Sequence, residues 1–262
     1  MQLQILIDFL ETIAPPHLQE NYDNAQLIVG DPHMEITGVL TCLDSTEAII
    51  EEALATGCNV VVAHHPIVFR GLKSFTGKNY VERTVMQAIK HDVAIYAIHT
   101  NLDNVLRHGV NERIAQRLGL VDYRILAPKK ADQPEIGSGL VGNLPTPMSE
   151  LDFLRLAKKQ LGAGVVKHTA LLDQSVQTVA VCGGAGGFLL DRAVGAGAQV
   201  FVTADYKYHE FFDADGRIVI ADVGHYESEQ STIQLLQELI SSKFSNFAAR
   251  CTKVRTNPVQ YL

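Results

Sequence analysis

The sequence predicts an α/β protein made of two similar halves, each with a largely parallel sheet. Three observations support this prediction. The chain of 262 residues is long for a single ordinary domain. Short continuous apolar runs alternate with segments of helical periodicity, as in βαβ units. The alternation returns 140 residues later in a constant register, so that Cys182 follows Cys42, and Val200 follows Val60, by this distance.

The first half, expected over residues 1–126, begins with a helix and continues with alternating strands and helices. The expected helices are 1–11, 48–55, 81–90 and 110–118, and the expected strands are 38–43, 59–63 and 93–98. Acidic side chains and the lack of basic residues near the start favour a helix over a signal peptide. A helix between two such strands implies a right-handed crossover between parallel strands.

The second half, expected over residues 127–262, repeats this pattern without an inserted third domain. The expected strands are 179–182, 199–202 and 217–223, the expected helix between the first two is 188–194, and the segment 127–177 is predicted to contain a strand at 139–142 and a helix at 150–161. Any two βαβ units look alike, so chance similarity is the alternative to a true repeat.

Composition and charge exclude several classes of protein. Hydrophobic residues make up 47% of the chain and charged residues 19%, as in ordinary globular proteins. No apolar run approaches the roughly 18 residues of a membrane span, and we expect a cytoplasmic protein. A net charge of −7 argues against a general attraction for nucleic acid or anionic lipid. The four cysteines contain no C-x-x-C pair and are expected to be small core residues of a reduced protein.

Side chains that commonly bind metals follow two predicted strands of the first half, where open parallel sheets bind ligands. His64 and His65 come directly after the strand 59–63. At a strand end both can turn inward and serve two neighbouring ions; the alternative is one buried histidine beside an exposed one. Asp103 follows the strand 93–98, and its alternative role is a helix N-cap. His99 could orient a ligand instead of binding metal.

A third set follows the last predicted strand of the second half. If a helix begins near His225, then His225 and Glu229 lie on the same face, whereas Glu227 points elsewhere. Three histidines and two carboxylates at strand ends from both halves form a mixed nitrogen and oxygen set, which suits Zn, Mn, Fe, Co or Ni. The sequence therefore predicts a site for two divalent metal ions between the halves.

Several blocks of the chain, in this order, resemble the Nif-three-like family, whose members are also called GTP cyclohydrolase I type 2 homologues. The blocks are Tyr22–Asp31, Ala63–Ile67, His99–Asp103, Cys182–Gly187, Asp205–His209 and Gly224–Glu229. The resemblance implies two similar α/β halves, a ring-shaped homohexamer (a toroid) and a dinuclear metal centre. Carried over to this chain, it gives the ligands His64, His65, Asp103, His225 and Glu229.

The chain departs from the family pattern in two places and in length. Gln26 stands where many members have glycine, and Leu140 stands where many have arginine. Both positions lie outside the ligand blocks, so they affect the details of the pocket and leave the metal site unchanged. Longer members insert a domain between the halves, for which this chain is too short.

Two further features lie near the expected site. The glycine-rich segment 183–187 could bind an anion through its backbone amides or form a tight turn. Asp205, Lys207 and His209 follow the strand that matches the one before His64 and His65, so we expect them at the pocket rim or in a solvated loop. The remaining histidines form no pattern and are expected at the surface: His17, His33, His91, His108 and His168.

Two functions fit these predictions. The first is a metal-dependent hydrolase that acts on a small molecule (a nucleotide, a phosphoester or a cyclic amide), with His99 or His209 as proton carriers. The second is a metal-binding or regulatory module without catalytic activity, which binds protein partners.

Overall fold

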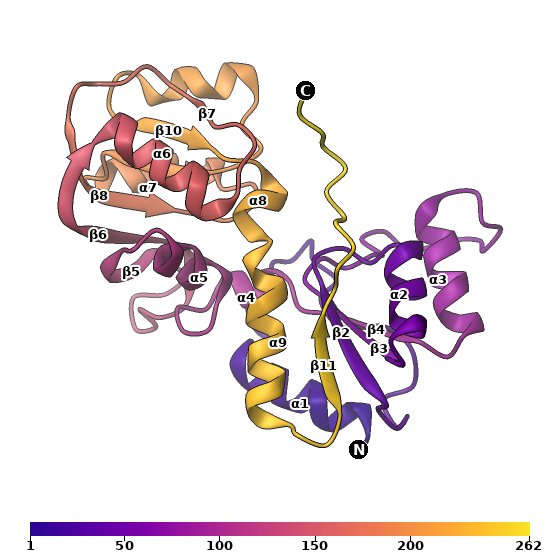
Figure 1. Ribbon diagram of the computed structural model, residues 1–262. Coiled ribbons are helices and arrows are strands. Elements are labelled where there is room, and N and C mark those ends of the chain that lie inside the picture. The colour runs from indigo at the N-terminus through magenta and orange to yellow at the C-terminus, as the bar shows by residue number, and fades with distance from the viewer. The chain divides into compact units, whose positions relative to one another are not determined.

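The computed structural model describes all residues from Met1 to Leu262 and shows two compact units (Figure 1). The first unit comprises residues 1–102 and 232–258, and the second comprises residues 103–231 and 259–262. These bounds differ from those of the expected halves, because residues 103–126 pack with the second unit and residues 232–258 with the first.

The first unit is built around a five-stranded sheet in the order β1-β4-β3-β2-β11. Its strands are β1 (Leu27–Val29), β2 (Gly38–Cys42), β3 (Val60–Ala63), β4 (Ala94–Ala97) and β11 (Ala248–Cys251). Its helices are α1 (Leu3–Ile13), η1 (Pro16–Leu18), α2 (Glu47–Ala55), α3 (Tyr80–Lys90) and α9 (Ser231–Lys243), and α4 (Thr100–Asp103) ends at the first residue of the second unit. Helices α2 and α3 pack side by side and share one core with alternate residues of β2, β3 and β4 (Figure 1).

The second unit contains a six-stranded sheet in the order β5-β6-β8-β9-β10-β7. Its strands are β5 (Val121–Pro128), β6 (Gly137–Ser149), β7 (Lys167–His168), β8 (Ser175–Val181), β9 (Val200–Thr203) and β10 (Val219–Asp222). Its helices are α5 (Val110–Arg117), α6 (Glu150–Leu161), η2 (Gly187–Leu189), α7 (Leu190–Gly195), η3 (Tyr208–Ala214) and α8 (His225–Glu229). The predicted helix 150–161 is therefore confirmed, and the predicted helix 188–194 is divided between η2 and α7.

Both sheets are mixed, so the prediction of largely parallel sheets is wrong. Strands β2, β3 and β4 pair in parallel, as do β8, β9 and β10, which confirms the βαβ units at the centre of each sheet. Strands β1, β5, β6 and β7 make antiparallel pairs. An apolar run shows that a strand is buried but does not give its direction, which depends on the connections between strands.

The repeat extends to the register of the paired strands. Val39 pairs with Val60 in the first sheet, and Val179 pairs with Val200 in the second. Both residues of the second pair lie 140 positions after those of the first. The pairing of the two strands is therefore the same in both sheets, with every residue number raised by 140, as expected for two related units.

Burial agrees with most predictions for isolated residues. Cys42, Cys58 and Cys182 are buried, but Cys251 is exposed on the edge strand β11, so its prediction as a core residue is wrong. The five histidines predicted at the surface are all exposed. None of the helices has the length and apolar character required to cross a bilayer.

Glu82, in the first turn of α3, is almost fully buried at 1% exposure. Its carboxylate accepts hydrogen bonds from the backbone N–H groups of Thr76 and Lys78, at 3.0 and 3.2 Å. The Thr76 amide, followed by the side chain of Lys78, lowers the pKa of Glu82 to about 2, against the opposing effect of burial. The folded chain therefore keeps this carboxylate ionised at pH values where the unfolded chain protonates it.

We expect Glu82→Gln to remove part of the acid sensitivity of this protein. The lowered pKa stabilises the fold above the ordinary glutamate pKa of 4.5, and this stabilisation is lost as the pH falls toward 2. Urea unfolding of wild type and variant is measured at several pH values. The difference between their free energies of unfolding should be largest at neutral pH and should shrink below pH 4.5. Glu51→Gln, on the exposed face of α2, is the control. A pH-independent difference between wild type and Glu82→Gln would contradict the prediction.

Candidate metal centre

In the first unit, three histidine rings converge at the ends of β3 and β4. The backbone amides of His64 and His65 donate to the carbonyls of Cys42 and Leu43, so the parallel pairing of β3 with β2 continues through both residues. The ring centroids of His64 and His65 are 4.9 Å apart, and each lies 5.2 Å from that of His99. One ring nitrogen from each histidine lies within 4.8 Å of the other two.

Each of these rings is oriented by an oxygen acceptor at Nδ1. His64 donates to the carbonyl of Ile98 at 2.9 Å, and His65 donates to the carboxylate of Asp44 at 2.8 Å. Because a carbonyl or carboxylate oxygen accepts the hydrogen bond, the proton of the neutral imidazole lies on Nδ1. Metal-binding histidines commonly have one ring nitrogen anchored in this way by a carbonyl or carboxylate oxygen.

Asp44 is held from a second side by the C-terminal segment of the first unit. Thr256 donates from its hydroxyl to the other carboxylate oxygen of Asp44, at 2.7 Å. Burial acts to raise the pKa of Asp44, but the hydrogen bonds from His65 and Thr256 outweigh it, and the pKa lies below its usual value. A hydroxyl more than 200 residues away in the sequence therefore fixes the carboxylate that orients His65.

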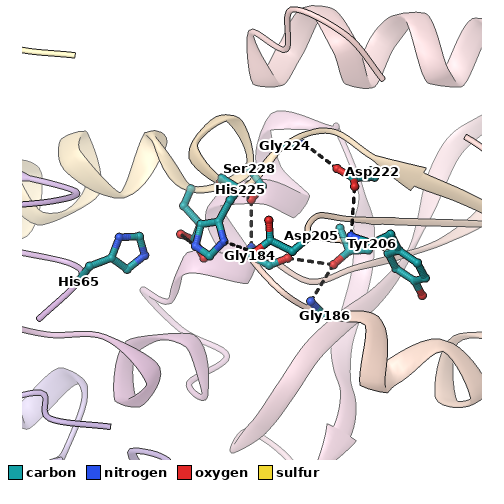
Figure 2. Close-up of polar contacts among 12 residues, drawn as sticks. His65, Gly184, Gly186, Asp205, Tyr206, Asp222, Gly224, His225 and Ser228 are labelled. Atoms are coloured by element: carbon teal, nitrogen blue, oxygen red, sulfur yellow. Dashed lines mark hydrogen bonds and ion pairs between the residues drawn. The ribbon is translucent and has the colours of Figure 1, made fainter. Parts of the chain in front are cut away.

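In the second unit, His225 and Glu229 form the predicted i, i+4 pair. They are the first and last residues of α8, and Nε2 of His225 lies 3.1 Å from Oε2 of Glu229. Nδ1 of His225 donates to the carboxylate of Asp205 at 2.7 Å (Figure 2). Burial alone would lower the pKa of His225, but Glu229 and Asp205 raise it to about 11. A metal ion bound at Nε2 would replace the proton of this imidazolium.

The ends of β9 and β10 bring Asp205 and His225 together. Asp222, the last residue of β10, accepts from the backbone amides of Tyr206 and Gly224, at 3.2 and 3.0 Å (Figure 2). These two bonds join the segment after β9 to the residue before α8. Asp205 and His225 are therefore held in register by one buried carboxylate.

Asp103 and Glu229 place two carboxylates close together in the second unit. An oxygen of one lies within 4.8 Å of an oxygen of the other, and Glu229 is only 3% exposed. Gly109 is the N-cap of α5, so the alternative role of Asp103 as the cap of that helix is not the one observed. Like charges at this separation repel, and a divalent cation between them would remove the repulsion. The donor set of the second unit therefore fits a divalent metal ion.

The glycine-rich segment 183–187 is a tight turn in which at least three amides bond within the fold. Gly183 donates to Asn111, and Gly186 donates to Thr203. Gly184 donates to Ser228 (Figure 2). Gly184 has φ +60°, and a Cβ there would lie 2.6 Å from Oε1 of Glu229 and 3.1 Å from Cε1 of His225. The absence of a side chain at Gly184 lets α8 pack closely against this segment. The segment is therefore a tight turn and not an anion site.

The structure places His209 and Lys207 in exposed positions near η3. The His209 ring contacts Tyr208 and stacks on Phe212, with centroids 5.1 and 6.3 Å away. Lys207 pairs with Glu210 at 3.5 Å. Of the three residues predicted at a pocket rim, Asp205 alone contacts a residue of the donor sets.

Two carboxylates that anchor histidine rings of the first unit, Asp44 and Asp23, were not among the residues predicted from the sequence. Asp44 lies two residues after β2 at the same sheet edge as His65, and this position could have identified it. Asp23 accepts from Nδ1 of His99 at 2.8 Å across 76 positions. It lies within one of the blocks that resemble the family, but no spacing rule links it to His99.

Comparison with known proteins identifies the family. A sequence model of the Duf34/NIF3 family (NGG1p interacting factor 3) matches residues 1–258. A Clostridium perfringens protein named GTP cyclohydrolase 1 type 2 homolog is 32% identical over 247 residues, which are 94% of each chain. Among solved structures, a hypothetical protein of Staphylococcus aureus has a TM-score of 0.93 at 28% identity, covering 100% of this chain and 99% of that one. A Bacillus cereus protein related to NIF3 has a TM-score of 0.91 at 25% identity, with the same coverage. This chain therefore belongs to the Duf34/NIF3 family, as its sequence blocks indicated.

Proposed function

We propose that this protein is a metal-dependent hydrolase whose ligands to two divalent ions are His64, His65, Asp103, His225 and Glu229. The observation that supports it most strongly is the second-unit donor set, in which two carboxylates approach within 4.8 Å beside a histidine anchored by Asp205. The anchored rings of His64 and His65 supply the same kind of donor from the first unit. That both sets serve one dinuclear centre is part of the proposal.

The proposed substrates are small molecules with a hydrolysable ring or ester: a nucleotide, a phosphoester or a cyclic amide. The names of the relatives point to GTP as one candidate. Bound divalent ions would supply Lewis acidity at a carbonyl or phosphoryl oxygen. Asp44 and Asp205 would hold the imidazole rings in position, and His99 or His209 would carry protons. The protein is proposed to act in the cytoplasm as a homohexameric ring.

The test is a turnover screen on protein freed of metal and then reloaded separately with Zn, Mn, Fe, Co or Ni. We expect two ions per chain by elemental analysis and conversion of at least one nucleotide, phosphoester or cyclic amide. The His64→Ala variant should lose this activity, and His91→Ala, which changes an exposed histidine of the same unit, should keep it. Loaded protein that converts no compound would overturn the hydrolase. Partner binding that requires metal would then support the regulatory module.

Thr256→Val is expected to weaken metal binding by about 10-fold, the lower end of the effect of residues that orient a ligand. The variant keeps the shape of the side chain but removes the hydroxyl that holds Asp44 behind His65. Thr256→Ser keeps the hydroxyl and should bind metal like wild type. Competition with a chromophoric chelator measures both affinities. Equal affinities in the two variants would show that this hydroxyl does not orient the site.

A further inference from the structure

We propose that the second unit carries a binding site for an aliphatic polyamine, in a groove that shares no residue with the metal donor sets. The groove has a volume of about 570 Å³, which is within the range of small-molecule sites. Its lining comes from η2, α7, η3 and the segment before β10, and we call it the η2–η3 groove. The lining residues that carry the argument are Phe188, Asp191, Phe212, Asp213, Asp215 and Arg217. This inference does not depend on the proposed function.

The first argument is the exposure of two phenyl rings in this groove. Phe188 is 72% exposed and Phe212 is 67% exposed. The Phe212 ring is supported by two neighbours, since His209 stacks on it at 6.3 Å and Tyr208 meets it edge-on at 5.7 Å. The face of a phenyl ring packs against methylene groups and attracts an ammonium group. Two such rings in one groove therefore suit an alkyl chain that carries positive charge.

The second argument is the charge of the groove. Its lining contains three carboxylates (Asp191, Asp213 and Asp215) and one guanidinium (Arg217), which leaves a net charge of −2. The guanidinium donates to the backbone carbonyl of Asp213 at 2.9 Å and lies 3.8 Å from the carboxylate of Asp191. The three carboxylates belong to none of the groups of side chains that could hold a metal ion. Separated carboxylates match positive charges that are spread along a chain, as in a polyamine.

The third argument is a buried hydroxyl beside the groove. Tyr206 is 6% exposed, its hydroxyl has no hydrogen-bond partner, and its ring points away from His225 (Figure 2). Gly187 lines the groove, and a Cβ there would lie 3.6 Å from Cζ and 3.9 Å from Oη of Tyr206. Burial, followed by the carboxylates of Glu210 and Asp213, raises the pKa of Tyr206, so the hydroxyl stays neutral. Buried hydroxyls normally have a partner, and an ammonium group of the ligand would supply one.

The test is calorimetric titration of the full chain, loaded with metal, with spermidine at low ionic strength. We expect one spermidine per chain, and the same affinity in metal-free Glu229→Gln protein, which lacks part of the metal centre. Asp213→Asn/Asp215→Asn should weaken binding by about 10-fold or more. Phe212→Leu, which keeps an apolar side chain without a ring, should weaken it by about 3- to 10-fold. Asp132→Asn, at an exposed position of the same unit outside the groove, is the control.

Two further variants separate a loss of binding from a loss of folding. Tyr206→Phe removes a hydroxyl that has no partner, so the free energy of unfolding should not fall, whereas spermidine affinity should fall by about 10-fold. Arg217→Gln removes the cation of the groove and should strengthen spermidine binding by about 2- to 5-fold. Damage to the fold cannot produce tighter binding.

Three results would overturn the proposal. The first is the absence of any heat of binding at millimolar spermidine. The second is equal affinity in Asp213→Asn/Asp215→Asn and Asp132→Asn, which would mean that spermidine responds only to the net charge of the chain. The third is that butylamine, with a single ammonium group, binds as tightly as spermidine. None of these results concerns the metal donors, so the proposed function would stand or fall separately, by the turnover screen.

Discussion

Glu229→Gln is expected to weaken metal binding by about 100-fold or more. Glu229 is buried on α8, with one oxygen 3.1 Å from His225 and one within 4.8 Å of Asp103. The amide of glutamine has the same shape but no charge to attract a cation. Changes to residues that only orient a ligand already weaken metal affinity by about 10- to 100-fold. Loss of a direct ligand should therefore weaken it by at least as much. Chelator competition and elemental analysis of the reloaded protein measure the loss.

Glu227→Gln is the matched control for this experiment. Glu227 is on the same helix and is 2% exposed, so both variants remove one buried carboxylate charge from α8. The Glu227 carboxylate lies against Gly224, and Glu227 belongs to none of the groups of side chains that could hold a metal ion. We expect Glu227→Gln to bind metal like wild type. If both variants lost metal affinity equally, the total charge of α8 would determine the affinity, and not coordination by Glu229.

Gly184→Ala is expected to destabilise the fold by about 1–3 kcal/mol and to weaken metal binding at the same time. Its φ of +60° is unfavourable for residues with a side chain, and the added methyl would lie 2.6 Å from Oε1 of Glu229. Either the turn or the carboxylate must move, and Glu229 then loses its position beside His225. Urea unfolding of metal-free protein measures the first effect, and chelator competition measures the second.

Gly195→Ala provides the comparison within the same unit. Gly195 is the last residue of α7, and a Cβ there would meet no atom within 4 Å. Replacing glycine by alanine in an open helical position stabilises a protein by up to about 1 kcal/mol. If Gly184→Ala behaved like Gly195→Ala, with unchanged metal affinity, close packing at Gly184 would not be needed to position Glu229.

The centre of each sheet was predictable, whereas its outer strands were not. The runs at β2, β3 and β4 are buried on both faces, and a helix lies between each pair, so parallel pairing follows from local sequence. Strand β6 returns along β5 after eight residues and pairs antiparallel with it, although its apolar centre looks like that of a parallel strand. The division into units differs from the expected halves because residues 232–258 return to the first unit.

Much of the donor set could also be predicted, because its spacing is local. His225 and Glu229 share a face through helical geometry, and His64 and His65 lie at a strand end that the sequence marks clearly. The residues that orient the rings of His65 and His99 are not local to them in the sequence. Asp44 lies 21 residues before His65, and Asp23 lies 76 residues before His99.

The sequence by itself determined which side chains stand at the ends of the central strands, because apolar runs and helical spacing are properties of neighbouring residues. It also determined the family, through blocks of residues that keep their order. Only the tertiary structure decided strand direction, the bounds of the units, and the hydrogen bonds that fix each histidine ring. Those bonds join residues far apart in the chain, and their partners depend on how the sheets and the segments after them pack. The donor state of each proposed ligand is therefore a product of the fold.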